Sequence, residues 1–318
     1  MIPRTTWDQR DIPDQTGKVA VITGANGGLG LASAKALAAK GAHVVMAARN
    51  QAKAEAARHE ILAEHPGASL EIVELDLGSL ASVASASKQI VDRHDRIDIL
   101  MLNAGVMAVP KATTVDGFDS QFGINVLGHW AMVGHVLPTL VATSAARVVA
   151  LSSMAQHTGR AIDPGDPHMR QGYDPWEMYG QTKLAMRHFA VGLQEQFEQA
   201  GLDAKALSAQ PGLTDSDLQT RTVEQGGGGL LGTISQRWVK LTGMSTDRGA
   251  LSQLRAATDP DAPGGGYYGP LFATNGPPVR KPLVRPGSTH AIATLWDVAT
   301  AETGVSVDVM AALGGTTA

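Results

Sequence analysis

The sequence predicts an α/β protein built on a mostly parallel sheet with helices on both faces. From Lys18 onward, short aliphatic or β-branched runs alternate with Ala-rich helical stretches, the pattern of repeated strand–helix–strand units. Hydrophobic residues make up 43% and charged residues 18% of the chain, enough apolar material to cover both faces of a sheet. The 318 residues are expected to form a single domain, because α/β folds often exceed the usual ~100–200 residues.

Six strands and the helices between them are expected in order along the chain. Strands of a parallel sheet are buried on both faces and therefore form nearly continuous apolar runs. Such runs occur at residues 19–23, 43–48, 70–74, 97–102, 147–151 and 204–209. Helical stretches separate them at about 30–40, 52–65, 79–93, 118–141 and 179–199. Right-handed crossovers would then place helices on both faces.

Two stretches interrupt this alternation. Residues 155–178 are rich in Pro, Gly, Asp and His and fall where an active-site loop is expected. Residues 214–246 join four successive glycines, at 226–229, to the apolar Leu230 and Leu231, a pattern typical of a mobile cover or of a surface hairpin of helices. We expect a core over about 16–260, a substrate-covering segment over about 213–246, and a tail over about 264–318 that ends in a helical appendage near 288–303.

The composition argues against several classes of function. The formal charge is −4 and the 26 Lys and Arg residues are scattered, so no nucleic-acid partner is expected. The chain has no cysteine, which removes disulfides, thiolate metal ligands and a cysteine nucleophile, and no metal site is predicted. No apolar run reaches the length of a bilayer span, and the first residues lack the apolar core of a signal peptide. A cytoplasmic protein without a membrane span is the expectation.

A glycine-rich turn joins the first predicted strand to the first helix. The segment VAVITGANGGLG places Gly24, Gly28 and Gly30 directly after an apolar strand, with Asn26 and Leu29 between them. Glycine allows the tight turn and leaves room for a phosphate group, and the free N–H groups of a helix N-terminus attract an anion. The sequence therefore predicts a Rossmann-type, doubly wound sheet with a dinucleotide site at this turn.

The end of the second strand indicates which dinucleotide is bound. An Asp or Glu there would hold the ribose 2′-hydroxyl, but the sequence has Ala48, Arg49 and Asn50, with Lys53 one helical turn later. A guanidinium can pair with a 2′-phosphate, which an acidic side chain would repel. NADP is therefore the expected cofactor, with NADPH preferred over NADH.

A second group of residues suits proton transfer. Tyr179 and Lys183 stand four apart in YGQTK and therefore share one helix face. A phenol with a pKa of about 10 is a poor acid or base at neutral pH, but an adjacent ammonium and the positively charged nicotinamide favour its ionised form. Upstream, a strand in RVVALSSMAQ ends at Ser152 and Ser153, where a hydroxyl can stabilise a developing charge on a substrate oxygen.

Over about residues 18–212, the order and spacing of these elements resemble the short-chain dehydrogenase/reductase family. The glycine spacing TGxxxGxG is similar to the family's cofactor signature, and Asn103-Ala104-Gly105 resembles its NNAG element, with Leu102 in place of the first Asn. The resemblance implies further cofactor contacts at three strand ends: Asp76 and Leu77; Asn103, Ala104 and Gly105; and Pro211, Gly212, Leu213 and Thr214.

The resemblance also implies the role of each residue in the chemistry. Ser153 would stabilise the substrate oxygen and Tyr179 would act as the acid or base. Lys183 would lower the pKa of Tyr179 and hold the ribose, and Asn125, in GINVLGHW, would support the proton relay by holding a water linked to Lys183. The implied activity is hydride transfer between a nicotinamide and a carbonyl or alcohol.

Within the family, the chain most resembles the group of retinol dehydrogenases, WW-domain oxidoreductase and protochlorophyllide reductases. The Leu-Asn-Ala-Gly element, FGINVLGHW and the 25 residues between Ser153 and Tyr179 carry this resemblance. Protochlorophyllide reduction is discounted, because those enzymes rely on cysteine in the pigment site. The apolar residues after Gly212 favour a lipophilic ketone, aldehyde or alcohol as the substrate.

Two other functions stay open. A nucleotide-sugar epimerase of the extended branch uses the same Ser, Tyr and Lys chemistry, but the glycine spacing and the short C-terminal part argue against it. A non-catalytic NADPH-binding regulatory protein would keep the fold without the reaction, and the intact Ser153, Tyr179 and Lys183 argue against that. Proteins of this fold often form homo-oligomers through helical edges, but no sequence feature here sets the number of subunits.

Overall fold

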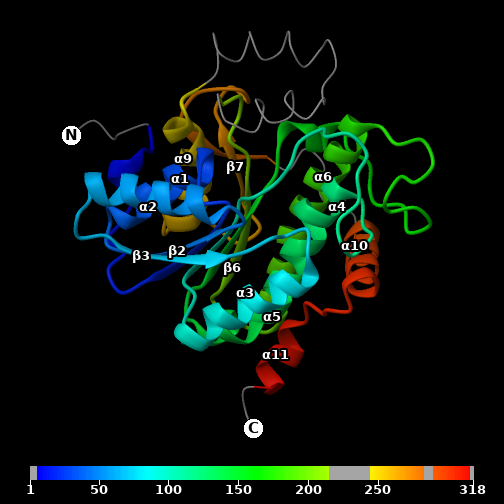
Figure 1. The fold of residues 1–318 in the computed structure, drawn as a ribbon, viewed down its shortest axis with the longest axis horizontal. Coiled ribbons are helices and arrows are strands. Elements are labelled where there is room, and N and C mark those ends of the chain that lie inside the picture. Colours follow the sequence, from blue (N-terminus) through cyan, green and yellow to red (C-terminus); the bar gives the residue numbers. More distant parts are fainter. Residues whose placement is uncertain (1–5, 215–243, 283–288, 316–318) are drawn as a thin grey trace.

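In the computed structural model, which describes residues 6–214, 244–282 and 289–315, one eight-stranded sheet runs through the molecule with helices on both faces (Figure 1). The strand order is β3-β2-β1-β4-β5-β6-β7-β8. The first six strands are parallel, as is β7 beside β6, and β8 pairs antiparallel with β7. The predicted Rossmann-type, doubly wound α/β fold is therefore confirmed. The strands are β1 (Val19–Thr23), β2 (His43–Ala48), β3 (Ser69–Glu74), β4 (Ile99–Leu102), β5 (Arg147–Leu151), β6 (Lys205–Ala209), β7 (Tyr267–Pro270) and β8 (Pro278–Lys281).

The helices form a layer on each side of the sheet. One layer contains α1 (Gly28–Ala38), α2 (Gln51–Glu64) and α9 (Thr246–Thr258). The other contains α3 (Leu80–Arg93), α5 (Gly128–Ala142) and α6 (Pro175–Gln199), with α10 (Thr289–Thr303) and α11 (Val309–Gly315) packed outside them. Short helical turns lie between these elements: η1 (Gln9–Asp11), α4 (Ser120–Phe122), η2 (Gly123–Leu127) and η3 (Met154–His157).

The strand order reverses between β1 and β4, so a crevice forms at the carboxyl ends of these two strands. The chain proceeds from β1 outward to β3 and then returns to add β4 on the other side of β1. Ligands of open parallel sheets bind at such a reversal. The fold therefore places the turn after β1, which carries the glycines, at the expected position of a dinucleotide site.

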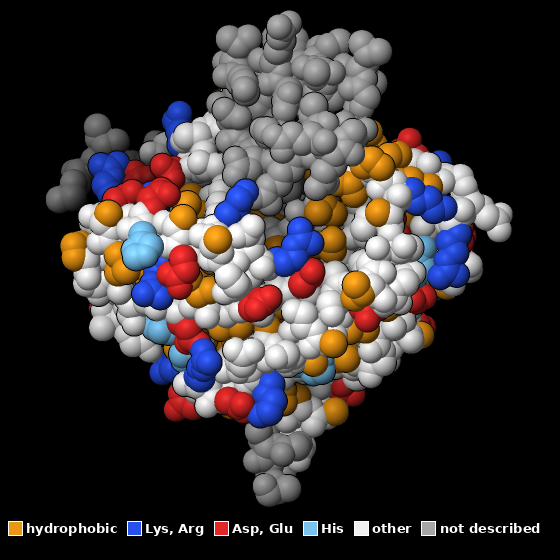
Figure 2. Space-filling view, in the orientation of Figure 1, with side chains coloured by type: hydrophobic (Ala, Val, Ile, Leu, Met, Phe, Trp, Pro, Cys, Tyr) orange, Lys and Arg blue, Asp and Glu red, His pale blue; other side chains and the backbone are white. Residues whose placement is uncertain are grey.

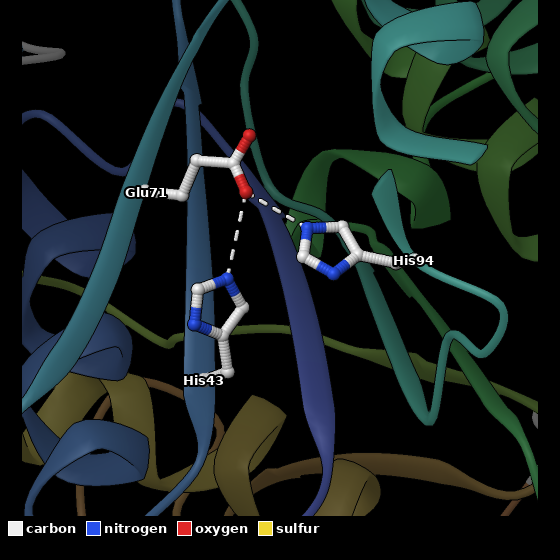
Figure 3. Close-up of side chains that lie close together, drawn as sticks. All are labelled: His43, Glu71 and His94. Atoms are coloured by element: carbon white, nitrogen blue, oxygen red, sulfur yellow. Dashed lines mark hydrogen bonds and ion pairs between the residues drawn. The ribbon is translucent and has the colours of Figure 1, made fainter. Parts of the chain in front are cut away.

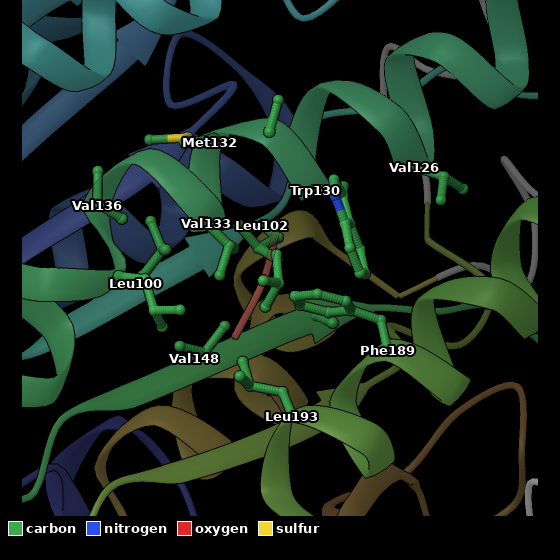
Figure 4. Close-up of a cluster of buried hydrophobic side chains, with 14 of the residues drawn as sticks. Leu100, Leu102, Val126, Trp130, Met132, Val133, Val136, Val148, Phe189 and Leu193 are labelled. Atoms are coloured by element: carbon green, nitrogen blue, oxygen red, sulfur yellow. The ribbon is translucent and has the colours of Figure 1, made fainter. Parts of the chain in front are cut away.

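The core between the sheet and α5 and α6 is mostly aliphatic, and a group of aromatic rings packs within it (Figure 4). The rings of Trp130 and Phe189 lie 5.9 Å apart and that of Trp296, on α10, lies 5.0 Å from Trp130. The indole N–H groups of Trp130 and Trp296 donate to the backbone carbonyls of Val305 and Val307 at 2.7 and 3.0 Å. These contacts attach α10 and the segment after it to the core.

The tail departs from the sequence prediction in its first half. No strand was predicted there, but β7 and β8 extend the sheet from six strands to eight. The strand β7, YYGP, is only four residues long, and its Gly and Pro disfavour a strand although its tyrosines favour one. Its pairing with β6 and its complete burial stabilise it instead. The helix expected near 288–303 is confirmed as α10.

One helical stretch, Ser120–Ala142, is long and apolar enough to cross a bilayer by length and composition, with a mean hydropathy of 1.2. Its most apolar window is 72% buried inside the protein, because this stretch includes α5, which packs on the sheet. Among the described residues, no other helix meets these criteria. Most of the predicted substrate-covering segment, including residues 226–229, Leu230 and Leu231, lies outside the described residues.

The docking of α10 depends on Gly192 of α6, and we predict that Gly192→Ala destabilises the protein. An added Cβ would lie 2.6 Å from two ring carbons of Trp296 and 2.7 Å from Ile292. The indole is held between other rings and cannot yield easily, so we expect a loss of about 1–3 kcal/mol in the free energy of unfolding. Urea denaturation measures this loss.

Gly314→Ala on α11 is the matched control, because no heavy atom lies within 4 Å of the added Cβ. Alanine is favoured over glycine in a helix by up to about 1 kcal/mol, so this variant should be as stable as the original protein or slightly more so. Equal effects of the two substitutions would contradict the role assigned to Gly192.

Candidate active site

The candidate site residues lie at one edge of the sheet, where the parallel strands end. Each of the first six strands is followed by at least one of them, because the carboxyl ends of parallel strands meet at the same edge. The residues in question are Gly24 after β1, Arg49 after β2, Asp76 after β3, Asn103 after β4, Ser153 after β5 and Pro211 after β6.

The turn after β1 has room only for glycine at two positions. Gly24 has a φ of +69°, a conformation that other residues rarely adopt. A Cβ on Gly30 would lie 2.3 Å from the carbonyl oxygen of Gly24 and 2.6 Å from the side-chain nitrogen of Asn103. No described side chain caps the start of α1, so its first N–H groups are available to an anion. This turn fits the pyrophosphate of a dinucleotide.

A cavity of about 480 Å³ extends from this turn along the strand ends. Polar and apolar side chains both line it, which suits a nucleotide. Eight of the predicted cofactor contacts line it: Gly24, Asn26, Arg49, Asn50, Asp76, Leu77, Ala104 and Gly105. The lining residues that were not predicted are Ala47, Ala48, Lys53, Leu75, Val106 and Ile124.

The other predicted cofactor contacts do not line this cavity. Gly28, Leu29 and Gly30 begin α1, Asn103 follows β4, and Pro211, Gly212, Leu213 and Thr214 follow β6. Gly212 has a φ of +74°, and its added Cβ would lie 2.5 Å from the carbonyl oxygen of Thr274. The N–H of Leu213 donates to that same oxygen at 2.8 Å, and Thr214 is buried against α9. The segment after β6 is therefore held in place by the loop that follows β7.

Arg49 and Asn50 differ in what their side chains do. The guanidinium of Arg49 is 71% exposed and lies 3.8 Å from the carboxylate of Asp76. An exposed pair at that distance contributes little to stability, so the guanidinium can take another partner at low cost. The side chain of Asn50 caps α2 by accepting from the N–H of Lys53 at 2.9 Å. Asn50 therefore has a structural role in addition to lining the cavity.

Asn125 lies in a π-helical turn, η2, where the sequence predicted ordinary helix over residues 118–141. Its side chain accepts from the N–H of Val106 at 2.8 Å and donates to the carbonyl of Val106 and the hydroxyl of Thr182 at 2.9 and 3.1 Å. These bonds join the segment after β4 to α6. Single π turns are rare and concentrate at functional sites, so the extra residue supports the selection of Asn125.

His129, one turn after Asn125, completes a buried network that the sequence reasoning did not include. One ring nitrogen, Nδ1, lies 3.1 Å from the carbonyl oxygen of Asn125, and Nε2 lies 3.0 Å from the hydroxyl of Thr23. A carbonyl can only accept, so Nδ1 carries the proton and the hydroxyl of Thr23 donates to Nε2. The hydroxyl in turn accepts from the N–H groups of Asn103 and Ala104, each at 2.9 Å. The one sequence feature that could have indicated this contact is the i, i+4 spacing of Asn125 and His129, which places them one helical turn apart.

Ser153, Tyr179 and Lys183 come together at the ends of β5 and the start of α6. Ser153 and Tyr179 are hydrogen-bonded through their side chains. The Nζ atom of Lys183 lies 5.5 Å from the centre of the Tyr179 ring and donates to the carbonyl of Leu151 at 3.3 Å. Two hydroxyls and an ammonium thus share one pocket, an arrangement that can stabilise and protonate an oxygen.

The two adjacent serines have different partners. The hydroxyl of Ser152 is buried and donates to the backbone carbonyl of Lys183 at 2.7 Å. Ser153 is only partly buried, and its hydroxyl is hydrogen-bonded to Tyr179 and accepts from the N–H of Ala155 at 3.3 Å. Ser152 therefore fixes the strand against α6, and Ser153 is the serine whose hydroxyl lies at Tyr179.

Burial sets the proton affinities of Tyr179 and Lys183. Desolvation raises the pKa of Tyr179 to about 12, and the bond with Ser153 offsets only part of this effect. Burial also lowers the pKa of Lys183 to about 8. The sequence predicted that Lys183 would lower the pKa of Tyr179, whereas in the structure burial is the largest influence on this pKa and raises it. The phenol is neutral at pH 7.

Two more side chains near the site had no signal in the sequence. Gln253 of α9 donates to Asn103 at 3.2 Å and to the hydroxyl of Ser33 at 2.8 Å. Arg187, one turn after Lys183, is fully buried, donates to Gln156 at 3.2 Å and lies over the ring of Tyr267. Both residues depend on elements far away in the chain, so local patterns could not identify them.

Comparison with known proteins agrees with this geometry. A family model described as short chain dehydrogenase matches residues 18–226. Polyprenol dehydrogenase of Mus musculus is 34% identical over 262 residues, which are 81% of this chain and 76% of that protein. Retinol dehydrogenase 13 of Homo sapiens is 37% identical over 207 residues, 65% of this chain and 62% of that protein. A crystal structure of an uncharacterized protein from Mycobacterium Paratuberculosis has a TM-score of 0.76 and 36% identity, covering 95% of this chain and 99% of that one.

The neutral state of His129 gives a testable dependence of stability on pH. Burial lowers its pKa to about 4, whereas an unfolded histidine titrates near about 6.5. The unfolded state therefore binds a proton first, and stability that is complete above about pH 6.5 is lost as the pH falls towards 4, by up to roughly 3 kcal/mol. In His129→Gln this loss should be absent.

The measurement is urea denaturation of both proteins between pH 7 and pH 5. We expect the variant to be less stable at pH 7 and the difference between the two proteins to shrink as the pH falls. His59→Gln, on the exposed face of α2, controls for removal of a histidine. A constant difference between the original protein and His129→Gln across this range would mean that His129 is not held neutral.

Proposed function

The chain belongs to the short-chain dehydrogenase/reductase family, and from this premise we propose that it is an NADPH-dependent enzyme that interconverts lipophilic carbonyl compounds and alcohols. The family consists of NAD(P)-binding oxidoreductases that act on CH–OH groups. The observation that carries the proposal is the grouping of Ser153, Tyr179 and Lys183 beside the cavity. Gly105 lines the cavity, and a Cβ added to it would lie 3.6 Å from Nζ of Lys183. Lys183 therefore lies next to the cavity wall.

Tyr179 is proposed as the proton donor in the direction of carbonyl reduction. The bound nicotinamide supplies the hydride in this reaction. A phenol whose pKa is raised to about 12 by burial carries its proton at neutral pH, and that is the form needed to protonate the substrate oxygen. The hydroxyl of Ser153, hydrogen-bonded to the phenol, would donate to the same oxygen as negative charge develops on it.

Lys183 and Asn125 are proposed to support this proton transfer. A pKa of about 8 leaves most of the Lys183 side chains charged at pH 7. The ammonium would stabilise the phenolate after the proton has left and would hold a ribose hydroxyl. Asn125, fixed by its bonds to Val106 and Thr182, is proposed to hold a water that resupplies the proton.

The exposed side chains around the site support a lipophilic substrate. Met154 and Trp176 are 41% and 45% exposed, and the ring of Trp176 lies 6.1 Å from that of Tyr179. Leu271 and Phe272, in the turn at the end of β7, are 47% and 69% exposed. Hydrophobic side chains lie along the upper part of the face drawn in Figure 2. Two relatives are named for polyprenol and retinol, which are long apolar alcohols. Lys and Arg are interspersed with acidic residues on the same face.

The preference for NADPH is proposed to depend on Arg49. The side chain lines the cavity and is mostly exposed, so it can pair with a 2′-phosphate. We expect Arg49→Asp to reduce the ratio of NADPH to NADH affinity by about tenfold or more, because a hydrogen bond to a charged group contributes roughly 1.5–3 kcal/mol. Affinities from fluorescence titration or thermal shifts with each cofactor measure the ratio.

Arg58→Asp, on α2, is the control. It changes the net charge by the same amount as Arg49→Asp, and Arg58 does not line the cavity. Its ratio should equal that of the original protein. Equal affinities of the original protein for NADPH and NADH would refute the proposed role of Arg49.

The reaction itself is tested with Tyr179→Phe. A panel of apolar ketones, aldehydes and alcohols, followed by nicotinamide absorbance, identifies a substrate for the original protein. Tyr179→Phe should then abolish turnover and leave NADPH binding largely intact, because only the phenolic hydroxyl is lost. Ser153→Ala should slow turnover by about 10²–10³.

Tyr268→Phe is the matched control, because it removes another buried tyrosine hydroxyl, on β7, and turnover should persist. If Tyr179→Phe retains near-normal turnover, the proton donor is another residue. If the original protein binds NADPH and turns over no substrate of the panel, a non-catalytic NADPH-binding protein becomes the better interpretation.

A further inference from the structure

A cluster of titratable side chains lies at the opposite end of β2 from the dinucleotide cavity. Among the described residues, His43, Glu71 and His94 form one group of possible metal ligands, with their ligand atoms all within 4.8 Å of one another. His43 is the first residue of β2, whereas Arg49 of the cavity follows the last. The cluster therefore has no contact with the proposed reaction.

The fold brings these three residues together from different parts of the chain. His43 is paired with Ser69 in the parallel register of β2 and β3, and Glu71, two residues later, points to the same face as Ser69. α3 packs over this face and ends at His94, its C-cap residue. The three side chains therefore meet from the start of β2, the middle of β3 and the end of α3. No local sequence pattern could indicate this.

The ligand atoms of the three residues face one another (Figure 3). Oε2 of Glu71 lies 2.8 Å from Nε2 of His94 and 3.5 Å from Nε2 of His43. The other carboxylate oxygen, Oε1, is occupied by Arg93. Nε2 of His43 is buried and makes no hydrogen bond with any described residue. A buried ring nitrogen that lies near a carboxylate without a hydrogen bond is costly unless something binds it.

We propose that His43, Glu71 and His94 bind a zinc ion. Two imidazole nitrogens and one carboxylate oxygen form a ligand set typical of Zn²⁺, with water as the fourth ligand. The side chains are 14–29% exposed, which leaves a path for the ion and room for the water. The ligand atoms need small shifts, since tetrahedral bonds of about 2.0–2.2 Å require them to be nearly equidistant.

Neighbouring groups hold the ligands as metal-binding ligands are held elsewhere. Nδ1 of His43 lies 2.7 Å from the hydroxyl of Ser69, so with Nδ1 as the donor Nε2 presents its lone pair to the ion. Arg93 orients the carboxylate of Glu71 by holding Oε1.

A zinc ion here would tie β2, β3 and α3 together and stabilise the folded chain, because an ion that binds only the folded state raises its stability. The test uses the full chain without a histidine tag, stripped of metal by a chelator that is then removed. Titration calorimetry with Zn²⁺ should give one ion per chain with a Kd of about 10 μM or tighter, and Zn²⁺ should raise the melting temperature.

The variants are His43→Gln and His94→Gln, each of which removes one ligand. Either change should weaken Zn²⁺ binding at least tenfold and remove the rise in melting temperature, as expected when a metal loses one of three protein ligands. His59→Gln, an exposed residue of α2, should bind Zn²⁺ as the original protein does.

X-ray absorption of the zinc complex of the original protein needs no variant and should show two imidazoles around the metal. A spectrum without imidazole ligands would overturn the proposal. So would a Kd weaker than about 1 mM in the original protein, or binding that persists in both His43→Gln and His94→Gln. None of these outcomes depends on the reaction proposed above, because no step of the test uses a nicotinamide cofactor.

Discussion

The hydroxyl of Thr23, at the last residue of β1, is the interaction on which the active-site edge depends. It accepts from the backbone N–H groups of Asn103 and Ala104 after β4 and bonds to His129 on α5. Through His129 it reaches the backbone of Asn125 in the π turn. The reversal of strand order leaves β1 and β4 side by side, so this one side chain connects the end of β1, the segment after β4 and, through His129, the π turn that contains Asn125. A buried network of this kind is stable only if every member is bonded.

Burial, more than pairing of opposite charges, determines the chemistry at this edge. Desolvation disfavours the charged forms of Tyr179, Lys183 and His129 alike, so the pKa of the phenol rises and the pKa values of the two bases fall. The phenol of Tyr179 and the imidazole of His129 are therefore neutral at pH 7, and the ammonium of Lys183 loses its proton more readily than an exposed lysine does. In the proposed reaction only the ammonium must remain charged to favour release of the phenolic proton, and its nitrogen lies 5.5 Å from the ring centre.

The sequence was sufficient where local pattern determines structure. The glycine turn, the first six strands and the Tyr179–Lys183 pair on one helix face all depend on short-range spacing. The structure contains each of them, and the turn and the pair lie at the same edge of the sheet. The π turn at Asn125, the strand β7 and the contact of Gln253 with Asn103 depend on tertiary packing, which spacing does not encode. The preference for NADPH stays a prediction, because the ion pair that Arg49 makes within the described part of the chain is with Asp76 and the phosphate that would select it belongs to the cofactor.

The helices that carry the site are positioned by the core that lies behind it. On α5, His129 bonds towards β1 while the next residue, Trp130, enters the aromatic core. On α6, Lys183 reaches the end of β5 while Phe189 stacks on Trp296. Successive residues of a helix point in different directions. The aromatic rings on one face of α5 and α6 therefore determine how deeply the polar groups on the other face are buried. A change in ring volume would therefore alter the burial of Lys183 and Tyr179, and with it their pKa values, without touching either residue.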